Sequence, residues 1–447
     1  MIPGFVDQAD FHEVDTFPSA DQLDPSMLYA LRLSNNTTRL THGLHRFPAK
    51  FIPQIPAWAI HEFTGPSDTL WDPFMGSGTS LLEAVAANRE GFGTDIDPLA
   101  QLITRAKVTP PSADSLEKAA RAIARKWRSS LEPTLPMPDI ESFEHWFTRD
   151  VWCELDGLLG AIDEVGSEPR LHDFLLAVFS SILRRVSNAD DQSQKTYVSG
   201  TNPKSPPPVR DTFFRALDRA RRGVLQFEAL DGNVRAEVVK GDALQSNLDD
   251  GSIDLVVTSP PYLDSVDYMY NFMLEYFWLG PRLGVETRQD FNEMRRAVVG
   301  AKNPSAKSHV LTRELDDLVS LDWMGPGRRA AAITYFDLMG AHFAEAARVT
   351  REGGRYVLVI GNSQTVDGVI PVHDCLIRLA HASGFELSHA FGYRVRRHYM
   401  KFPRKGRGGI ILLDWVVTLR RTDDPSSPSP GSLPLPWLTL HPAAVAN

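Results

Sequence analysis

The chain has 447 residues and a formal net charge of −9, with 43% hydrophobic and 23% charged residues. This composition is typical of a soluble globular protein, and the acidic balance argues against a protein that coats nucleic acid through charge alone. The apolar runs have only strand length, and the acidic start MIPGFVDQADFHEVD lacks the apolar core of a signal peptide. Two distant cysteines, Cys153 and Cys375, indicate neither a disulfide framework nor a metal site. We therefore expect a cytoplasmic protein that has no membrane-spanning segment and no metal site.

A regular alternation of strands and helices begins at Asp68, after a polar stretch that we interpret as an N-terminal extension over residues 1–40. The segment DTLWDPF predicts a strand, GSGTS a turn and LLEAVAANR a helix. The segments EGFGTDID and PLAQLITRA predict the next strand and helix. This rhythm is typical of a parallel sheet in an α/β protein.

The pattern is helical between residues 110 and 235, where a polar loop at 188–210 interrupts it. We interpret this region as an inserted helical subdomain and slightly favour it for target recognition. The segment 266–327, which contains RRAVVGAKNPSAKSH, is the alternative.

The sheet resumes with AEVVKGDA, SIDLVVTSPPY and GGRYVLVIGN. The last two predicted strands, FELSHAFGYRVRR and GGIILLDWVVTLRR, form an antiparallel pair that closes the sheet. Residues 41–109 and 236–421 are therefore predicted to form one domain, followed by a disordered Ser- and Pro-rich tail over 422–447.

Two glycines, Gly76 and Gly78, separate the first strand from its helix, where a ligand can approach backbone N–H groups. A dinucleotide fingerprint would need glycine in place of Leu81, and a phosphate loop would need a lysine that this turn lacks. Asp72 at the strand end would repel phosphates and suits a cationic ligand. A generic strand–helix turn is the alternative interpretation.

Acidic residues also end the second and third strands. Asp95 suits a ribose diol, because a carboxylate can accept two hydroxyl hydrogen bonds, and Asp242 could accept from an adenine amine. A helix cap is the alternative role for Asp95. The combination of residues at one sheet edge predicts a ligand crevice.

The fourth strand ends in the corner TSPPY, residues 258–262. Its prolines fix the backbone, so that Ser259, pre-aimed carbonyl oxygens and the ring of Tyr262 are presented together. Acceptors beside a flat ring suit an exocyclic amino group on a planar base. A proline-terminated strand with a buried tyrosine is the alternative.

With DPFMGSGT, GTDIDP and TSPPY, and with HGLHRFPAKFIPQ upstream, the chain resembles the S-adenosylmethionine-dependent amino-methyltransferases of DNA bases, of the cytosine-N4 and adenine-N6 type. The resemblance implies a Rossmann-like, seven-stranded, mostly parallel sheet with the last strand antiparallel. It implies a catalytic corner made of Ser259, Pro260, Pro261 and Tyr262. It also implies S-adenosyl-L-methionine as cofactor, held by Phe47, Pro48, Ala49, Lys50, Asp72, Pro73, Phe74, Gly76, Ser77, Gly78, Thr79, Asp95, Ile96, Asp242 and Ala243.

In this family a serine at the position of Ser259 usually accompanies cytosine N4, whereas aspartate or asparagine accompanies adenine N6. We therefore expect direct methyl transfer to cytosine N4 in double-stranded DNA after base flipping, with Arg394, Arg396, Arg397 and Lys401 meeting phosphates. An exposed basic hairpin tip is the alternative for those four residues. C5 chemistry is not expected, because neither cysteine lies at a strand end.

An adenine-N6 enzyme, an RNA base methyltransferase and a catalytically silent DNA-binding relative are the alternatives. A cognate restriction endonuclease or phage-defence components could accompany the enzyme in a restriction-modification system.

Overall fold

The computed structural model describes most of the chain, with short gaps. The described residues are 11–24, 28–32, 37–48, 50–133, 143–191, 196–201, 203–232, 234–263, 267–305, 307–364, 368–394 and 413–423. The predicted tail from residue 424 onward, together with Ala49, Arg396, Arg397 and Lys401, lies outside them.

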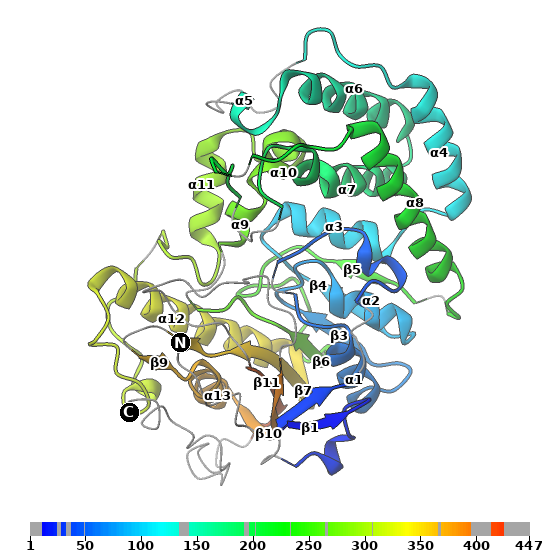
Figure 1. The fold of residues 1–447 in the computed structure, drawn as a ribbon. Helices are drawn as coiled ribbons and strands as arrows, with labels where there is room; N and C mark the ends of the chain where they lie inside the picture. The colour runs from blue at the N-terminus through cyan, green and yellow to red at the C-terminus, as the bar shows by residue number, and fades with distance from the viewer. Residues whose placement is uncertain are drawn as a thin grey trace.

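One large sheet organises the described part of the chain (Figure 1). In spatial order its nine strands are β1 (Phe11–Val14), β2 (Leu28–Leu31), β10 (Phe385–Arg394), β11 (Leu413–Arg421), β7 (Thr350–Gly361), β6 (Ile253–Thr258), β3 (Thr69–Asp72), β4 (Glu90–Gly93) and β5 (Ala236–Val238). A separate two-stranded sheet pairs β8 (Ser363–Gln364) with β9 (Val369–Ile370).

The last strand, β11, runs antiparallel to both of its neighbours, β10 and β7, and the other strand pairs of the large sheet are parallel. The predicted seven-stranded, mostly parallel sheet with an antiparallel last strand is therefore confirmed. The strands β1 and β2 were not predicted, because the segment that we interpreted as an extension shows only weak periodicity. They lengthen the sheet, with β2 beside β10.

Helices cover both faces of the sheet, as the alternation of side chains along β6 shows. Leu255 and Val257 pack in a cluster with α1 (Gln54–Phe63) and α2 (Thr79–Ala86). Val256 packs on the other face with α12 (Pro326–Val349) and α13 (Val372–Ala382). Because successive side chains of a strand point to opposite faces, both sides of this central strand are buried.

The helical region between β4 and β5 contains α4 (Ala113–Lys126), α5 (Phe143–Trp146), α6 (Arg149–Val165), α7 (Pro169–Val186) and α8 (Val209–Glu228). These helices gather at one end of the molecule in Figure 1. They share an apolar core with α3 (Pro98–Val108) and α10 (Met273–Leu279). The region is helical as predicted, while its role as a separate subdomain remains a prediction.

The remaining short helices are α9 (Tyr268–Asn271), α11 (Arg288–Ala297) and the 3-10 turns η1 (Ala20–Gln22), η2 (Leu40–Gly43), η3 (Gly280–Leu283) and η4 (Arg313–Leu315). In the described part of the polar loop after α7, Lys204 Nζ anchors the chain by donating to the carbonyl oxygens of Arg184 and Ala189. In the part of the chain that the structure describes, no helix is both long and apolar enough to span a bilayer.

Candidate active site

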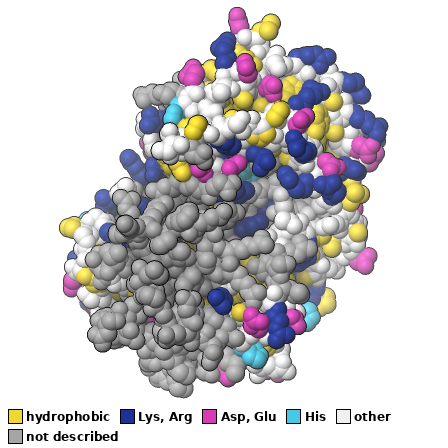
Figure 2. Space-filling model, viewed as in Figure 1, with side chains coloured by type: hydrophobic (Ala, Val, Ile, Leu, Met, Phe, Trp, Pro, Cys, Tyr) yellow, Lys and Arg dark blue, Asp and Glu magenta, His cyan; other side chains and the backbone are white. Residues whose placement is uncertain are grey.

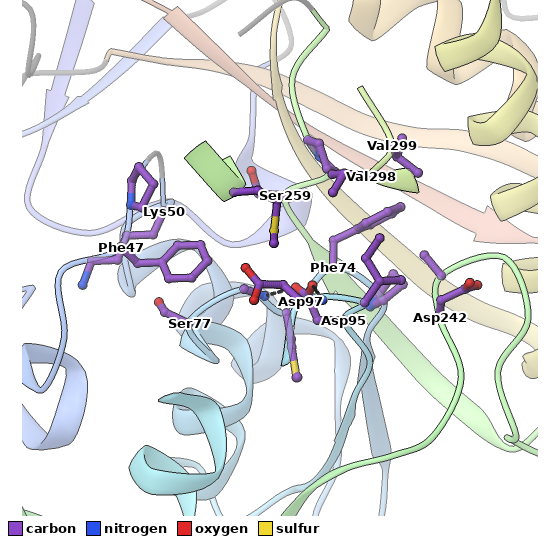
Figure 3. Close-up of a pocket in the computed structure, with 18 of the residues that line it drawn as sticks. Phe47, Lys50, Phe74, Ser77, Asp95, Asp97, Asp242, Ser259, Val298 and Val299 are labelled. Carbon is purple, nitrogen blue, oxygen red and sulfur yellow. Dashed lines mark hydrogen bonds between the residues drawn. The ribbon is translucent and has the colours of Figure 1, made fainter. Parts of the chain in front are cut away.

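A cavity of about 120 Å³ lies at the carboxyl ends of β3, β4 and β6, beside the turn that follows β5 (Figure 3). The structure brings most of the predicted site residues to its wall, from segments that are distant in the sequence. Those residues are Phe47, Pro48, Lys50, Pro73, Phe74, Gly76, Ser77, Thr79, Asp95, Ile96, Asp242, Ala243, Ser259 and Pro261.

The glycine turn after β3 needs glycine at both positions. Gly76 and Gly78 have φ angles of +48° and +68°, in the left-handed region that favours glycine. A Cβ on Gly76 would lie 3.0 Å from the ring of Phe47, and one on Gly78 would lie 2.6 Å from Thr104 Cγ2. The backbone of the turn is therefore held against side chains that leave no room for a substituent.

Helix α3 fixes this turn through two hydrogen bonds to carbonyl oxygens. Thr104 Oγ1 donates to Gly76 O at 3.0 Å, and Lys107 Nζ donates to Ser77 O at 2.7 Å. Lys107 is fully buried, and burial lowers the pKa of its amine well below the usual range. Burying an amine costs free energy, and the hydrogen bond to Ser77 O, which fixes the shape of the turn, offsets part of that cost.

Asp95, after β4, is held by the turn that it faces. Its Oδ2 accepts from Gly76 N at 2.9 Å, and its Oδ1 accepts from Asp97 N at 2.9 Å. Burial raises the pKa of Asp95, and the neighbouring Asp97 carboxylate raises it further. Asp97 caps α3 by accepting from Leu99 N at 2.8 Å and Ala100 N at 3.2 Å. Asp95 is thus oriented toward the cavity while Asp97 serves the helix.

Asp242, after β5, is also oriented by its own backbone. Its Oδ1 accepts from Leu244 N at 2.7 Å and Gln245 N at 3.0 Å, and no described residue donates to its Oδ2. Behind it, the Nδ1 of His342 lies 2.7 Å from the carbonyl oxygen of Ala243. Burial lowers the pKa of His342 to about 4, so the ring is neutral and donates this bond.

The corner that ends β6 places an oriented hydroxyl at the cavity. Ser259 Oγ donates to Val359 O, on the neighbouring strand, at 3.1 Å. A hydroxyl has one proton and two lone pairs, so its oxygen remains free to accept bonds from a ligand. Pro261 lines the cavity, whereas Pro260 is buried and does not reach the wall. Tyr262 is half-buried and lines a second, adjoining cavity.

Two further predicted residues do not reach the wall. Asp72 is only 1% exposed, accepts from Phe74 N at 3.2 Å, and has its pKa raised to about 6 by burial. Asp72 therefore holds the start of the turn through the Phe74 amide, and Gly78 belongs to the turn without lining the cavity. Arg394 is exposed at the end of β10, and its contact with phosphates stays a prediction.

The sequence interpretation assigned no cofactor or catalytic role to several residues of the wall. Asp97 and Phe51 stand in or beside quoted motifs, so position could have suggested them. Met75 stands inside the quoted DPFMGSGT, and no motif marks the others, which come from the turn after β5, α9 and the end of α11. These others are Leu244, Met269, Ala297, Val298 and Val299.

A mostly parallel sheet with an antiparallel last strand, and a ligand cavity at the carboxyl ends of its strands, defines an α/β enzyme of the methyltransferase class. The family model described as DNA methylase matches residues 16–104. The Type II methyltransferase M.MvaI of Kocuria varians is 31% identical over 323 residues, which cover 67% of this chain and 69% of that protein. The Type II methyltransferase M.BsoBI of Geobacillus stearothermophilus is 22% identical over 443 residues, 86% of each chain.

Among solved structures, a SAM-dependent methyltransferase from Methanosarcina mazei matches with a TM-score of 0.29, 11% identity and coverage of 82% of this chain and 97% of that one. An rRNA methyltransferase from Streptomyces viridochromogenes has a TM-score of 0.32, 11% identity and coverage of 87% and 93%. The sequence relatives decide the assignment: the chain belongs to the DNA methylase family. Members of this family methylate amino groups of DNA bases, with S-adenosylmethionine as the methyl donor.

Proposed function

We propose that this protein transfers a methyl group from S-adenosylmethionine to the exocyclic N4 amine of cytosine in double-stranded DNA, after the base has left the duplex stack. The observation that carries the proposal is the position of Ser259, whose hydroxyl lies on the wall of the same cavity as Asp95, Asp242 and the glycine turn. An acceptor for an amine thus adjoins the place where a methyl donor would bind.

The cavity residues fit the cofactor. Asp95 is oriented to accept from a ribose diol, and the unshared Oδ2 of Asp242 can accept from an adenine amine. Ser77 is 2% exposed, and its hydroxyl has no hydrogen-bond partner among the described residues, which leaves it available to the amino-acid end of the ligand near Lys50. When bound, the cofactor supplies an electrophilic methyl group on a sulfonium.

Ser259 orients the amine that receives the methyl group. Its proton is committed to the Val359 carbonyl, so Oγ can accept an N–H bond from the target nitrogen. Pro260 itself does not line the cavity but stands between the wall residues Ser259 and Pro261, and its carbonyl is our proposed second acceptor. Two acceptors would direct the nitrogen lone pair toward the methyl group, and their bonds would strengthen as positive charge develops on nitrogen. Transfer is then a direct displacement without a covalent enzyme intermediate, and positioning supplies much of the acceleration.

Tyr262 provides the proposed face for the extruded base. Its phenol forms a side-chain hydrogen bond with the half-buried Asp414 of β11, and desolvation raises the pKa of that carboxyl to about 6. The bond fixes the orientation of the half-buried ring, which prepares it for stacking. Tyr262 and Ser259 flank the corner prolines in the sequence, and the two cavities that they line share Pro261 in their walls.

The base assignment can be tested directly. The protein is expressed in a host that lacks DNA methylation, and its DNA is analysed by nucleoside mass spectrometry and modification-aware sequencing. We expect N4-methylcytosine in one fixed sequence context. N6-methyladenine would replace the cytosine assignment, and modification confined to RNA would replace DNA as the substrate. Because two relatives are Type II methyltransferases, we also propose a companion endonuclease of the same specificity as the partner to seek.

A further inference from the structure

A second cavity, of about 500 Å³, adjoins the first behind the catalytic corner. The two cavities share four wall residues, Pro261, Met269, Val298 and Val299. The remaining wall of the second cavity includes Tyr262 and comes largely from the C-terminal end of α11 and the loop that follows it, over residues 292–307. A ligand that stacks on Tyr262 would therefore extend into this cavity.

The loop after α11 is folded back onto the corner. Gly300 has a φ angle of +81°, and a Cβ there would lie 3.4 Å from Tyr262 O and 3.5 Å from Pro261 Cβ. Ser305 N donates to Arg296 O at 3.2 Å and closes the base of the loop. The loop backbone that carries the cationic side chains is consequently held beside the corner.

One of these cations is already engaged by the protein. Arg295 Nε donates to Asp267 Oδ2 at 2.6 Å, and its guanidinium lies 5.3 Å from the ring centre of Tyr270. Asp267 is the only acidic residue on the described wall. This pair ties α11 to the segment that follows the corner, and it neutralises both charges.

The other cations of the wall are Arg296, Lys302 and Lys307. All are exposed, and within the described part of the chain no hydrogen bond or ion pair engages their side-chain nitrogens. Figure 2 shows Lys and Arg side chains on the helical end of the molecule and at its junction with the sheet, although the chain as a whole is acidic. A concentration of unengaged positive charge inside a cavity, in a protein of net negative charge, indicates an anionic ligand.

We propose that the second cavity binds the DNA backbone phosphates on either side of the extruded nucleotide, through Arg296, Lys302 and Lys307. The inference rests on the proposed function, because it takes the base to lie between Ser259 and Tyr262. The sugar and phosphates of that nucleotide must then occupy the space beyond the shared wall. Phosphate contacts there would hold the nucleotide outside the helix without reading its sequence.

The test compares two triple variants that remove the same charge. One is Arg296→Ala/Lys302→Ala/Lys307→Ala. The control is Arg125→Ala/Arg149→Ala/Arg170→Ala, which removes three exposed arginines of the helical region that likewise have no ion pair among the described residues. Binding to a duplex that contains the sequence methylated by the enzyme is measured at several salt concentrations. The slope of log K against log salt concentration is negative, and each lost phosphate contact reduces its magnitude by about 0.9. The three substitutions of the cavity variant should therefore reduce that magnitude by roughly 2 to 3.

Position on the DNA is tested with a neutral methylphosphonate next to the target nucleotide. We expect this substitution to weaken binding by the wild type and by the control variant, and to leave the cavity variant almost unchanged. A cavity variant with the wild-type salt slope overturns the proposal. A reduced salt slope in the control variant alone also overturns the proposal, since the helical region would then hold the DNA.

Two further measurements separate this proposal from the proposed function. Cofactor binding by calorimetry should be the same in all three proteins, and thermal unfolding checks that the variants fold; single Lys302→Ala and Lys307→Ala variants replace the triple if it does not. Binding needs no methyl transfer, so the phosphate assignment is tested even if adenine proves to be the methylated base. If the wild type methylates DNA and the cavity variant keeps the wild-type salt slope, only the phosphate assignment is overturned.

Discussion

Replacing Ser259 by alanine tests the central element of the mechanism. The substitution removes the hydroxyl that lies at the cavity and donates to Val359 O at 3.1 Å. It leaves the glycine turn, Asp95 and Asp242 untouched. Methyl transfer should therefore be impaired while cofactor binding is retained, because Ser259 is proposed to contact the amine of the base.

The expected size of the effect follows from the bonds that are lost. A hydrogen bond to a group that becomes charged contributes about 1.5–3 kcal/mol. If this bond forms fully only as the amine becomes cationic, its loss lowers kcat by roughly 10- to 150-fold. The bond to Val359 O is a neutral one, and its removal should cost about 1 kcal/mol of folding stability. Affinity for S-adenosylmethionine should remain within about twofold, since no cofactor contact is removed.

A matched control is available at the other end of the same strand. Ser252 precedes β6, and its Oγ donates to Asp249 O at 2.7 Å on the protein surface. Ser252→Ala removes the same chemical group without approaching the cavity, so kcat should not change. Single-turnover methylation and calorimetry with the cofactor measure the two quantities. Equal losses of transfer and cofactor affinity in Ser259→Ala would refute the proposed role.

Other predictions concern the cofactor side of the cavity. Asp95 must be ionised to accept both ribose hydroxyls, and burial and Asp97 raise its pKa; calorimetry should show cofactor affinity rising as the pH increases through neutrality, a dependence that Asp95→Asn should abolish. Lys107→Met removes the donor to Ser77 O; it should weaken cofactor binding about tenfold or more, while thermal unfolding changes little, because the apolar side chain removes the cost of burying the amine and so offsets the lost hydrogen bond. Gly78→Ala forces a Cβ into the left-handed region and against Thr104, so the protein should lose at least about 1–2 kcal/mol in denaturant unfolding. In contrast, Gly160→Ala in α6, where a Cβ would meet nothing within 4 Å, should stabilise it by roughly 0.5–1 kcal/mol.

Much of the sheet could be predicted because its strands carry local signals. The alternation of short apolar runs, glycine turns and amphipathic helices predicted β3, β4, β6 and β7 together with their helices. The closing pair β10 and β11 was recognisable from two adjacent apolar runs. The strands β1 and β2 gave no such signal, since they lie in a polar stretch of weak periodicity and gain their stability by pairing at the edge of an existing sheet.

Site residues could be predicted where a motif ends a strand. They were harder to predict where the orientation of a side chain, or the return of a distant chain segment, decides whether a residue reaches the cavity. Asp72 and Asp95 both follow strands, yet one side chain is buried beneath the turn and the other faces the cavity. Sequence position alone does not distinguish the two orientations. Met269 and Val298 reach the wall only because the segment after the corner folds back on it, and no local pattern encodes that return.

Helix α3 connects the two parts of this enzyme more closely than the sequence suggested. One side of it donates to the glycine turn through Thr104 and Lys107. Another side packs into the core of the helical region, where Arg105 Nε also bonds Asp173 of α7 at 2.8 Å. A displacement of the helical region would therefore be transmitted to the carbonyl oxygens of the turn, because close-packed interiors shift as units. The helical region thus supports the cavity that we propose for the cofactor, whether or not it also recognises DNA.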